Sequence, residues 1–338
     1  MIAAATLTSS PELLARIDEL QRRCLIAGAA GLALSVIGYF VSPEQFFRSY
    51  LVAFVLWNGV ALGSLAIAML HHLSGGQWGV VIRRMLEAAS RTFPVTLVLF
   101  LPIAFGMRYL YSWSRPEVIA TDHLLQHKLA YLNVPFFLGR TAFYFAIWIA
   151  LAHMLSKWSL EQDRSGAEPA HTRMQMLSGP GLLLYGFTVT FSSIDWIMSL
   201  DPHWFSTIFG ILFMGGQGVS ALAFVILVIV LLIDYHPMSA AIFPRHLHDY
   251  GKLLFAFVML WAYFSFSQFL IVWSANLPEE IPFYLKRMAG GWKWISLALI
   301  FLHFVLPFLL LLSQNTKKNY RTLWRIAALV FFMRFVDL

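Results

Sequence analysis

The chain of 338 residues contains a single cysteine, Cys24, and only 12% of its residues are charged. One cysteine excludes an internal disulfide and an iron–sulfur cluster ligated by four cysteines of this chain. An ordinary globular domain carries about 25% charged residues, so the low charge content excludes that class. Residues 1–23 lack the long apolar core of a cleavable signal peptide, so we expect no such peptide here.

Apolar residues dominate instead, because 59% of the chain is hydrophobic and the mean hydropathy is +0.70. A transmembrane helix needs roughly 20 apolar residues. Runs near that length occupy residues 24–41, 46–70, 93–111, 134–155, 181–199, 205–233, 253–273 and 292–312, and a shorter ninth run begins near residue 323. We therefore predict an all-α polytopic membrane protein with about nine transmembrane helices, with a long polar loop at residues 156–180.

The positively charged residues are spread among the loops, so the net charge of +7 does not indicate nucleic-acid binding. Most lysines and arginines lie in the N-terminal segment and in the loops after the even-numbered runs. The loops on the other side hold only Arg48, Arg115, Lys128, Lys286, Arg287 and Lys293. The positive-inside rule then places the N-terminus in the cytoplasm. Residues 1–23, in which Ser9 and Pro11 mark a helix start, are expected to form a helix lying on the inner surface.

Polar side chains form a stripe along the fifth apolar run. Tyr185, Thr188, Ser192 and Asp195 are spaced at i, i+3, i+7 and i+10, which places them on one helix face. An aspartate within a membrane span costs about 2.5–3.5 kcal/mol, and Arg140 of the fourth run falls at a similar depth. We predict an Arg140–Asp195 ion pair. An equally weighted interpretation makes this an outer-side site for a quinol head group or an exiting proton.

Asp201, Pro202 and His203 follow the fifth run directly. We interpret Asp201 as a structural N-cap of the sixth helix, with Pro202 in its first turn. Histidine side chains titrate near neutral pH, so His203 is a candidate for proton transfer.

Further candidates lie in the last two apolar runs. Ser265 and Gln268 share one face of the seventh run, and Asp249 and Lys252 precede its apolar part. These residues form either the inner mouth of a proton half-channel or a solvated loop, and the sequence leaves both open. His303 lies in the middle of the eighth run. A membrane haem of the b type needs two axial histidines at matching depth, and only His303 is deep, so we expect no haem. No apolar run contains two metal-binding side chains at the spacing of a metal site, so we expect no metal either.

Small residues recur in two runs. Gly59 and Gly63 lie four residues apart in the second, and Gly210, Gly215, Gly216 and Gly218 lie in the sixth. Such residues let helix backbones approach closely, so we interpret them as helix-packing positions.

Three long motifs in the second half of the chain resemble one known family. They are FSSIDWIMSLDPHWFST at residues 191–207, HDYGKLLFAFVMLWAYFSFSQ at 248–268 and SANLPEE at 274–280. All three resemble the ActF membrane subunit of bacterial alternative complex III. KLAYLN at 128–133, followed by Arg140, is also similar to that subunit. The resemblance covers the chain from about residue 45 onward.

The resemblance implies a fold of the NrfD/PsrC kind, with two four-helix bundles side by side. The first would span residues 46–200 and the second 201–338, with residues 24–45 forming a peripheral transmembrane helix. It also implies a further span beyond Leu338.

The resemblance further implies a role in the bacterial cytoplasmic membrane, in a complex that oxidises menaquinol or ubiquinol and reduces a cytochrome c or a similar carrier. The implied partners are an ActC-like paralogue, an iron–sulfur subunit, c-type cytochrome subunits and, in some assemblies, a terminal oxidase. Haem c and iron–sulfur clusters would sit on those partners, and this chain would bind no cofactor of its own.

This chain would then supply scaffold together with candidate proton-conducting or quinone-site residues. One alternative of the same class is an NrfD-type quinol-binding anchor of a polysulfide or molybdenum oxidoreductase. A secondary transporter is a third interpretation. Such transporters often show paired Gly/Pro interruptions of helices in corresponding repeats, and the sequence shows no such pair.

Overall fold

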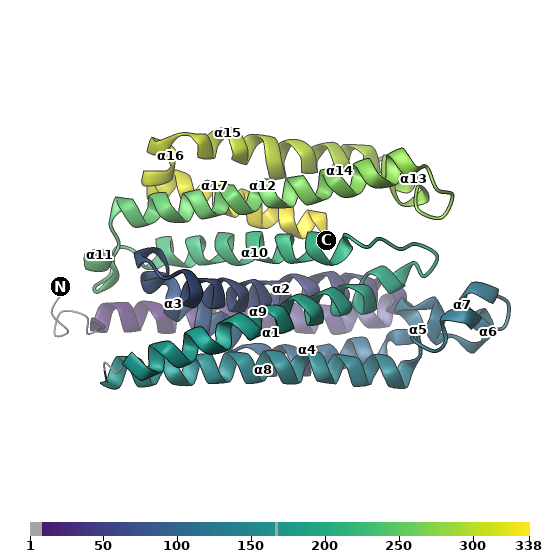
Figure 1. Ribbon diagram of the computed structural model, residues 1–338, viewed down its shortest axis with the longest axis horizontal. Helices are drawn as coiled ribbons and strands as arrows, with labels where there is room; N and C mark the ends of the chain where they lie inside the picture. Colours follow the sequence, from purple (N-terminus) through teal and green to yellow (C-terminus); the bar gives the residue numbers. More distant parts are fainter. Residues whose placement is uncertain (1–8, 166–167) are drawn as a thin grey trace.

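The computed structural model describes residues 9–165 and 168–338, and within these ranges it is helical with no β-strand. Figure 1 shows long helices lying nearly parallel to one another. The long helices are α1 (Pro11–Val41), α2 (Pro43–Ser74), α8 (Val134–Ser165), α9 (Glu168–Trp196), α10 (Phe209–Leu232) and α12 (Pro244–Ala275). Among the described residues, eight helical segments are long and apolar enough to cross a membrane. The prediction of an all-α polytopic membrane protein is therefore confirmed.

Shorter helices complete the chain. They are α3 (Gln77–Ser90), α4 (Phe93–Phe105), α5 (Met107–Leu110), α6 (Pro116–Ile119), α7 (His123–Lys128), α11 (Met238–Ala241), α13 (Pro282–Met288), α14 (Trp292–Ala298), α15 (Leu306–Leu312), α16 (Gln314–Lys318) and α17 (Tyr320–Asp337). A π-helical segment, Leu299–Val305, joins α14 to α15. The predicted ninth run corresponds to α17, which carries Arg321, Arg325, Arg334 and Asp337 and is not one of the eight apolar segments.

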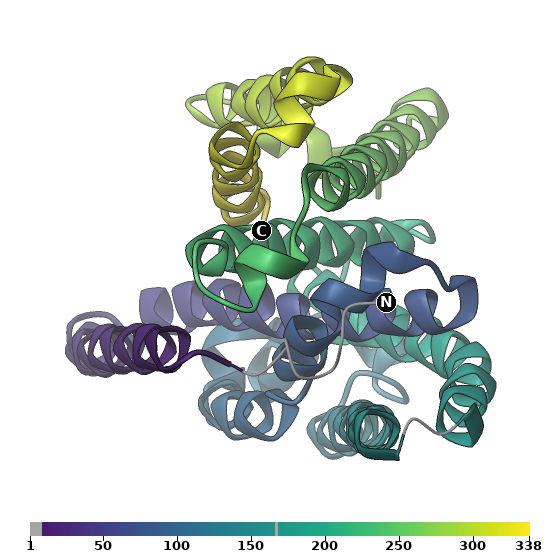
Figure 2. The same cartoon turned by 90° about the vertical axis from the view of Figure 1, so that its left-hand side faces the viewer.

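Helix α1 begins as the sequence indicated. The hydroxyl of Ser10 accepts a hydrogen bond of 3.1 Å from the backbone N–H of Leu13, which caps the helix. The helix then runs without a break to Val41, so the expected surface helix and the first apolar run are one element. Leu13 is its only buried residue. Figure 2 shows α1 at the side of the molecule, in contact with the rest along one edge.

The predicted polar loop at residues 156–180 is wrong. Helix α8 continues to Ser165 and α9 begins at Glu168, so most of the segment is helical. Charged side chains there pair with neighbouring helices instead of lying in a coil: Asp163 is 2.7 Å from Arg83, and Glu161 is 3.5 Å from Arg173. The two helices therefore extend past the apolar part of the molecule with a solvated, ion-paired face.

The buried apolar residues form two clusters. One lies among α2, α4, α8 and α9, and it includes Phe100, Phe145, Trp148 and Trp196. The other lies among α10, α12, α15 and α17, with further residues from α2 and α3. Helix α10 packs against α2 and α9 on one side and α12 and α17 on the other, so it lies between the two clusters (Figure 1).

The backbones of α2 and α10 approach closely where the two helices cross. A methyl group built on Gly63 would lie 2.2 Å from the backbone carbonyl oxygen of Gln217, so only glycine fits at this position. The interpretation of Gly59 and Gly63 as packing positions is confirmed, because both lie against Gln217.

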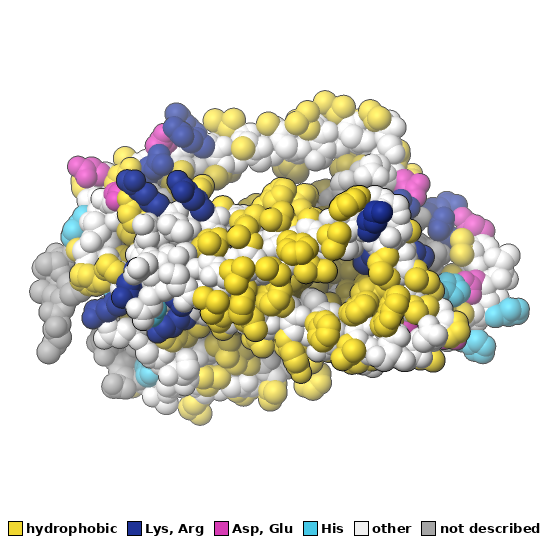
Figure 3. All heavy atoms as spheres, turned by 90° about the horizontal axis from the view of Figure 1, so that it is seen from above, with side chains coloured by type: hydrophobic (Ala, Val, Ile, Leu, Met, Phe, Trp, Pro, Cys, Tyr) yellow, Lys and Arg dark blue, Asp and Glu magenta, His cyan; other side chains and the backbone are white. Residues whose placement is uncertain are grey.

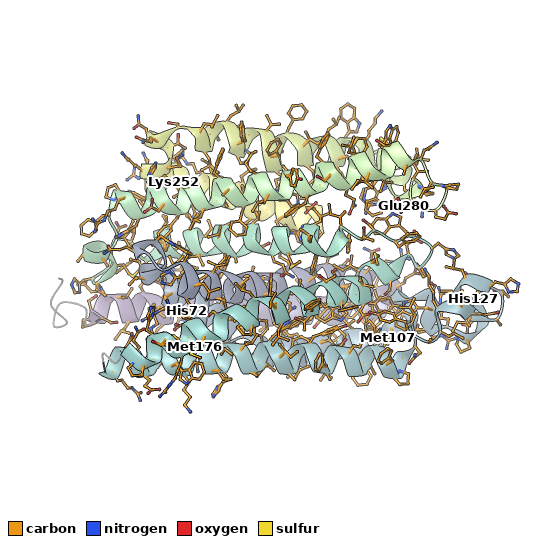
Figure 4. All side chains as sticks on the ribbon, in the orientation of Figure 1. His72, Met107, His127, Met176, Lys252 and Glu280 are labelled. Carbon is orange, nitrogen blue, oxygen red and sulfur yellow. The ribbon has the colours of Figure 1, made fainter. Side chains whose placement is uncertain are left out.

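The two ends of the molecule differ. The N-terminal end carries the start of α1, the end of α2 and the start of α12, where His72, Met176 and Lys252 are labelled in Figure 4. The opposite end carries α5, α6, α7 and α13, where Met107, His127 and Glu280 are labelled. On the face in Figure 3, the charged side chains lie mostly toward these two ends, with an apolar band between them.

Candidate functional site

The centre of the site is a two-pronged ion pair between α8 and α9. Arg140 Nε donates to Asp195 Oδ2 and Arg140 Nη2 to Asp195 Oδ1, each at 2.9 Å. The predicted Arg140–Asp195 pair is therefore confirmed. It lies near the opposite end of the molecule, because Arg140 is in the second turn of α8 and Asp195 is next to the last residue of α9.

Two tyrosines complete the surroundings of the pair. The hydroxyl of Tyr144, one turn after Arg140, donates to Asp195 Oδ2 at 2.8 Å. Arg140 Nη1 donates to the backbone carbonyl of Tyr131 at 3.0 Å, and the guanidinium carbon lies 3.8 Å from the centre of the Tyr131 ring. Burial, with a contribution from the Asp195 carboxylate, raises the pKa of Tyr131, which stays a protonated phenol.

Both charges of the Arg140–Asp195 pair are largely removed from solvent. Asp195 is fully buried, and the side chain of Arg140 is 11% exposed. Each charge is compensated by the other and by hydrogen bonds, so removing one partner would leave a buried charge at a cost of about 3–5 kcal/mol. The ring of Phe136 lies 4.2 Å from the guanidinium carbon and is itself half exposed, so it lies between the guanidinium and the surface of the molecule.

The rest of the polar stripe on α9 is buried, but its members bond to different partners. Tyr185 donates to Gln217 Oε1 on α10 at 2.7 Å, and Thr188 accepts from the indole N–H of Trp148 at 2.9 Å. The hydroxyl of Ser192 donates to the carbonyl of Val189 in its own helix. The stripe therefore ties α9 to α8 and α10 rather than forming an unbroken side-chain relay to Asp195.

Gln217 was missed by the sequence analysis. It is 1% exposed, and its side-chain nitrogen has no hydrogen-bond partner among the described residues. The available signal was a lone glutamine within the apolar sixth run, between glycines that bring α2 close.

The segment after α9 is pinned by charged contacts at the opposite end. Asp201 Oδ2 is 3.1 Å from Lys286 Nζ, and α10 begins only at Phe209, with Ile208 as its N-cap. The interpretation of Asp201 as a helix cap is therefore wrong. Residues 201–204 instead form a turn, in which the backbone N–H of Trp204 donates to the carbonyl of Asp201 at 3.0 Å, and Lys128 donates to the carbonyl of Pro202 at 2.6 Å.

His203 contacts a carboxylate in this segment. Its Nε2 is 2.8 Å from Oδ2 of Asp122, and Asp122 also caps α7 by accepting from the backbone N–H groups of Leu124 and Leu125. Partial burial raises the pKa of Asp122, but the backbone N–H groups and His203 together hold that pKa below its usual range. His203 is thus an exposed hydrogen-bond partner of Asp122, and none of its contacts is with Arg140 or Asp195.

The four candidates on α12 are not brought together. Asp249 and Lys252 form an exposed pair at 3.5 Å near the N-terminal end (Figure 4). Gln268 lies near the opposite end, where its amide is within 3.3 Å of the hydroxyls of Ser206 and Tyr284. Ser265 is half-buried. Residues 253–260 between the two groups are all apolar, so α12 itself offers no polar path from one end to the other.

A second buried ion pair lies in the other cluster, and the sequence analysis missed it. Arg334 Nη1 pairs with Asp337 Oδ2 on α17, and the indole N–H of Trp261 donates to the same oxygen at 3.1 Å. The available signal was an arginine and an aspartate three residues apart in an apolar helix.

His303 lies beside this second pair. It is fully buried in the π-helical segment, and its ring is perpendicular to that of Trp261 with centroids 4.2 Å apart. Within the described part of the chain, neither ring nitrogen of His303 has a hydrogen-bond partner. Short π-helical segments occur frequently at functional sites.

The geometry thus gives an ion pair beside each apolar cluster, with the Arg140–Asp195 pair the more fully bonded. Comparison of the sequence with models of protein families and with curated proteins finds no match.

Proposed function

We propose that this chain is the ActF-like membrane subunit of a respiratory complex that oxidises quinol, of the alternative complex III type. Its own contribution is structural support together with a proton- or quinol-handling site at Arg140 and Asp195. The proposal rests on the resemblance of three motifs, at residues 191–207, 248–268 and 274–280, to that family. The observation that carries it is the buried, bidentate pair at the end of the FSSIDW segment.

The sidedness of the site supports this role. By the positive-inside rule, the N-terminal end faces the cytoplasm and the Arg140–Asp195 end faces the outside. A carboxylate buried near the outer surface is where a proton released by quinol oxidation would leave. A charged group inside a membrane protein is expensive, and it is usually retained for such a role or for a structural partner.

The chemistry available at the site follows from its donors. Asp195 is the proton acceptor, and Arg140 and Tyr144 donate three hydrogen bonds to its side chain. Tyr131 and Phe136 cover the guanidinium, so a movement of the half-exposed Phe136 would open the pair to a quinol head group from the membrane. The electron carriers of the reaction belong to partner subunits.

The test begins with an affinity-tagged chain purified from its native membrane. We expect an iron–sulfur subunit and c-type cytochromes to copurify, and the preparation to reduce cytochrome c with quinol. Copurification of a molybdenum or polysulfide-reducing subunit would favour the NrfD-type anchor instead. A chain that purifies alone and moves a solute across vesicles would support the transporter.

The site itself is tested by Asp195→Asn in that complex. The substitution removes the charge but keeps the shape and an acceptor oxygen for Arg140, which also bonds the carbonyl of Tyr131, so we expect a less stable complex that still assembles. Quinol oxidation or proton release should fall at least tenfold. Asp201→Asn, which changes an exposed acid at the same end, is the matched control and should leave turnover unchanged. Full activity of Asp195→Asn in an assembled complex would reject the functional role.

A further inference from the structure

A cavity of about 430 Å³ opens at the N-terminal end, beside the turn between α3 and α4. Arg91 of that turn forms one side. The other side is one face of α8, where His153, Ser156, Lys157, Glu161 and Arg164 recur every three or four residues. None of these residues belongs to either buried ion pair.

The cavity carries positive charge that the described residues do not compensate. Arg91, Lys157 and Arg164 form no ion pair with any carboxylate in the described ranges, and the one acid of the lining, Glu161, is 3.5 Å from Arg173. Neighbouring arginines behave differently, because Arg83 and Arg84 are both paired with Asp163. Unpaired cations gathered around a cavity point to an anionic ligand.

An exposed apolar stripe leads away from the cavity toward the opposite end. On α4, it begins four residues after Arg91 with Val95 and continues through Val98 and Leu101 to Phe105, all of them exposed. Helix α4 packs along α8, whose exposed Leu160 lies at the cavity itself. A free anion would satisfy the three cations but would make no use of this stripe.

We propose that the cavity binds the phosphate group of an anionic phospholipid, with the acyl chains lying along the exposed stripe of α4. Basic pockets between transmembrane helices at the cytoplasmic surface recognise such head groups, and the positive-inside rule places this end at that surface. Arg91 and Arg164 suit the phosphate oxygens through paired N–H donors, and Lys157 adds a third charge. The inference does not depend on the respiratory role proposed above.

The test is native mass spectrometry of the protein purified with its accompanying subunits. It is titrated with phosphatidylglycerol or phosphatidylcholine of identical acyl chains. We expect tighter retention of phosphatidylglycerol, lost by about tenfold or more in the triple variant Arg91→Gln, Lys157→Gln, Arg164→Gln. The matched control is Arg22→Gln, Arg245→Gln, Arg325→Gln, which removes three exposed cations at the same end outside this cavity and should keep the preference.

Three outcomes would overturn the proposal. They are equal retention of the two lipids, an equal loss in the control variant, and displacement of phosphatidylglycerol by millimolar inorganic phosphate, which would indicate a site for the free anion. If the triple variant does not fold, Lys157→Gln alone decides: we expect about a twofold to fivefold weaker retention of phosphatidylglycerol, and unchanged retention would count against the site.

Discussion

Gly216 of α10 lies directly against the guanidinium group of Arg334 on α17. A methyl group built on Gly216 would come within 2.4 Å of Arg334 Cζ, which is closer than non-bonded carbon atoms approach. Arg334 is 5% exposed and pairs with Asp337, so a side chain at residue 216 would have to push the guanidinium out of its present position. The absence of a side chain at residue 216 is therefore what admits the second ion pair into the apolar cluster.

Gly216→Ala should displace Arg334 and weaken its pairing with Asp337. Overpacking of this kind costs about 1–3 kcal/mol, so we expect a lower midpoint in thermal unfolding of the detergent-purified protein. Gly186→Ala is the control, because a methyl group there meets nothing within 4 Å and alanine favours the helix. An unchanged midpoint for Gly216→Ala would show that the α10–α17 contact yields easily.

The Arg140–Asp195 pair predicts a non-additive double-mutant cycle. Arg140→Gln alone leaves the fully buried carboxylate without its cation, at a cost of about 3–5 kcal/mol. Adding Asp195→Asn removes that stranded charge, so the double variant should be more stable and assemble in higher yield than Arg140→Gln. Thermal unfolding and the yield of monodisperse protein measure this. Additive losses would contradict a coupled pair.

His303→Leu should be neutral or stabilising, by up to about 1–3 kcal/mol. The ring has two unpartnered nitrogens in a fully buried position, and replacing an unsatisfied polar group with an apolar one removes its desolvation cost. The exposed His127→Leu is the control and should change stability by no more than about 0.5 kcal/mol. A marked loss of stability in His303→Leu would mean that a bound water or ligand satisfies the ring in the native protein.

Asp122 predicts a pH dependence at the opposite end. Its folded pKa lies below the usual 3.8, so the carboxylate stabilises the fold above pH 3.8, and this contribution is lost as the pH falls through the lower folded value. Asp122→Asn should therefore be less stable than the parent at pH 5–7, with the difference vanishing as the medium becomes more acidic than the folded pKa. Thermal unfolding across this pH range measures it.

The control for that pH dependence is His203→Gln. It removes one contact to Asp122 and leaves the backbone N–H groups of Leu124 and Leu125 in place, so part of the pH dependence should persist. If the parent and Asp122→Asn responded identically to acid, the carboxylate would have no part in holding this end together.

The hydropathy pattern and the helical spacing predict the long helices and the Arg140–Asp195 pair, because both depend on local periodicity and on depth along a helix. The local sequence could not show whether Asp201 caps a helix. That sequence suits a helix start, but contacts from Lys286 to Asp201 and from Lys128 to Pro202 accompany a turn that lies outside the helix. Those contacts come from elements 70 or more residues away in sequence.

The second ion pair was missed, and the loop at residues 156–180 was wrongly predicted, for related reasons. Arg334 and Asp337 have the spacing of a local pair, but their burial depends on the packing of α17 against its neighbours, which brings Trp261 to Asp337 and is not contained in any local pattern. Charged residues around Asp163 resemble a loop when their partners are unknown. In the structure, Arg83 and Arg84 lie beside Asp163, and the charged residues around it form the solvated face of a helix that continues to Ser165.

The fit of Gly63 against the carbonyl of Gln217 also limits how the molecule can move. A transporter that alternates access by rocking one bundle against the other needs a joint between bundles that can open and close. Here α10 packs against both apolar clusters, and Gly63 of α2 contacts the backbone of α10 directly. Rocking would unseat that contact in every cycle. The contact between Gly63 and Gln217 therefore counts against the transporter interpretation.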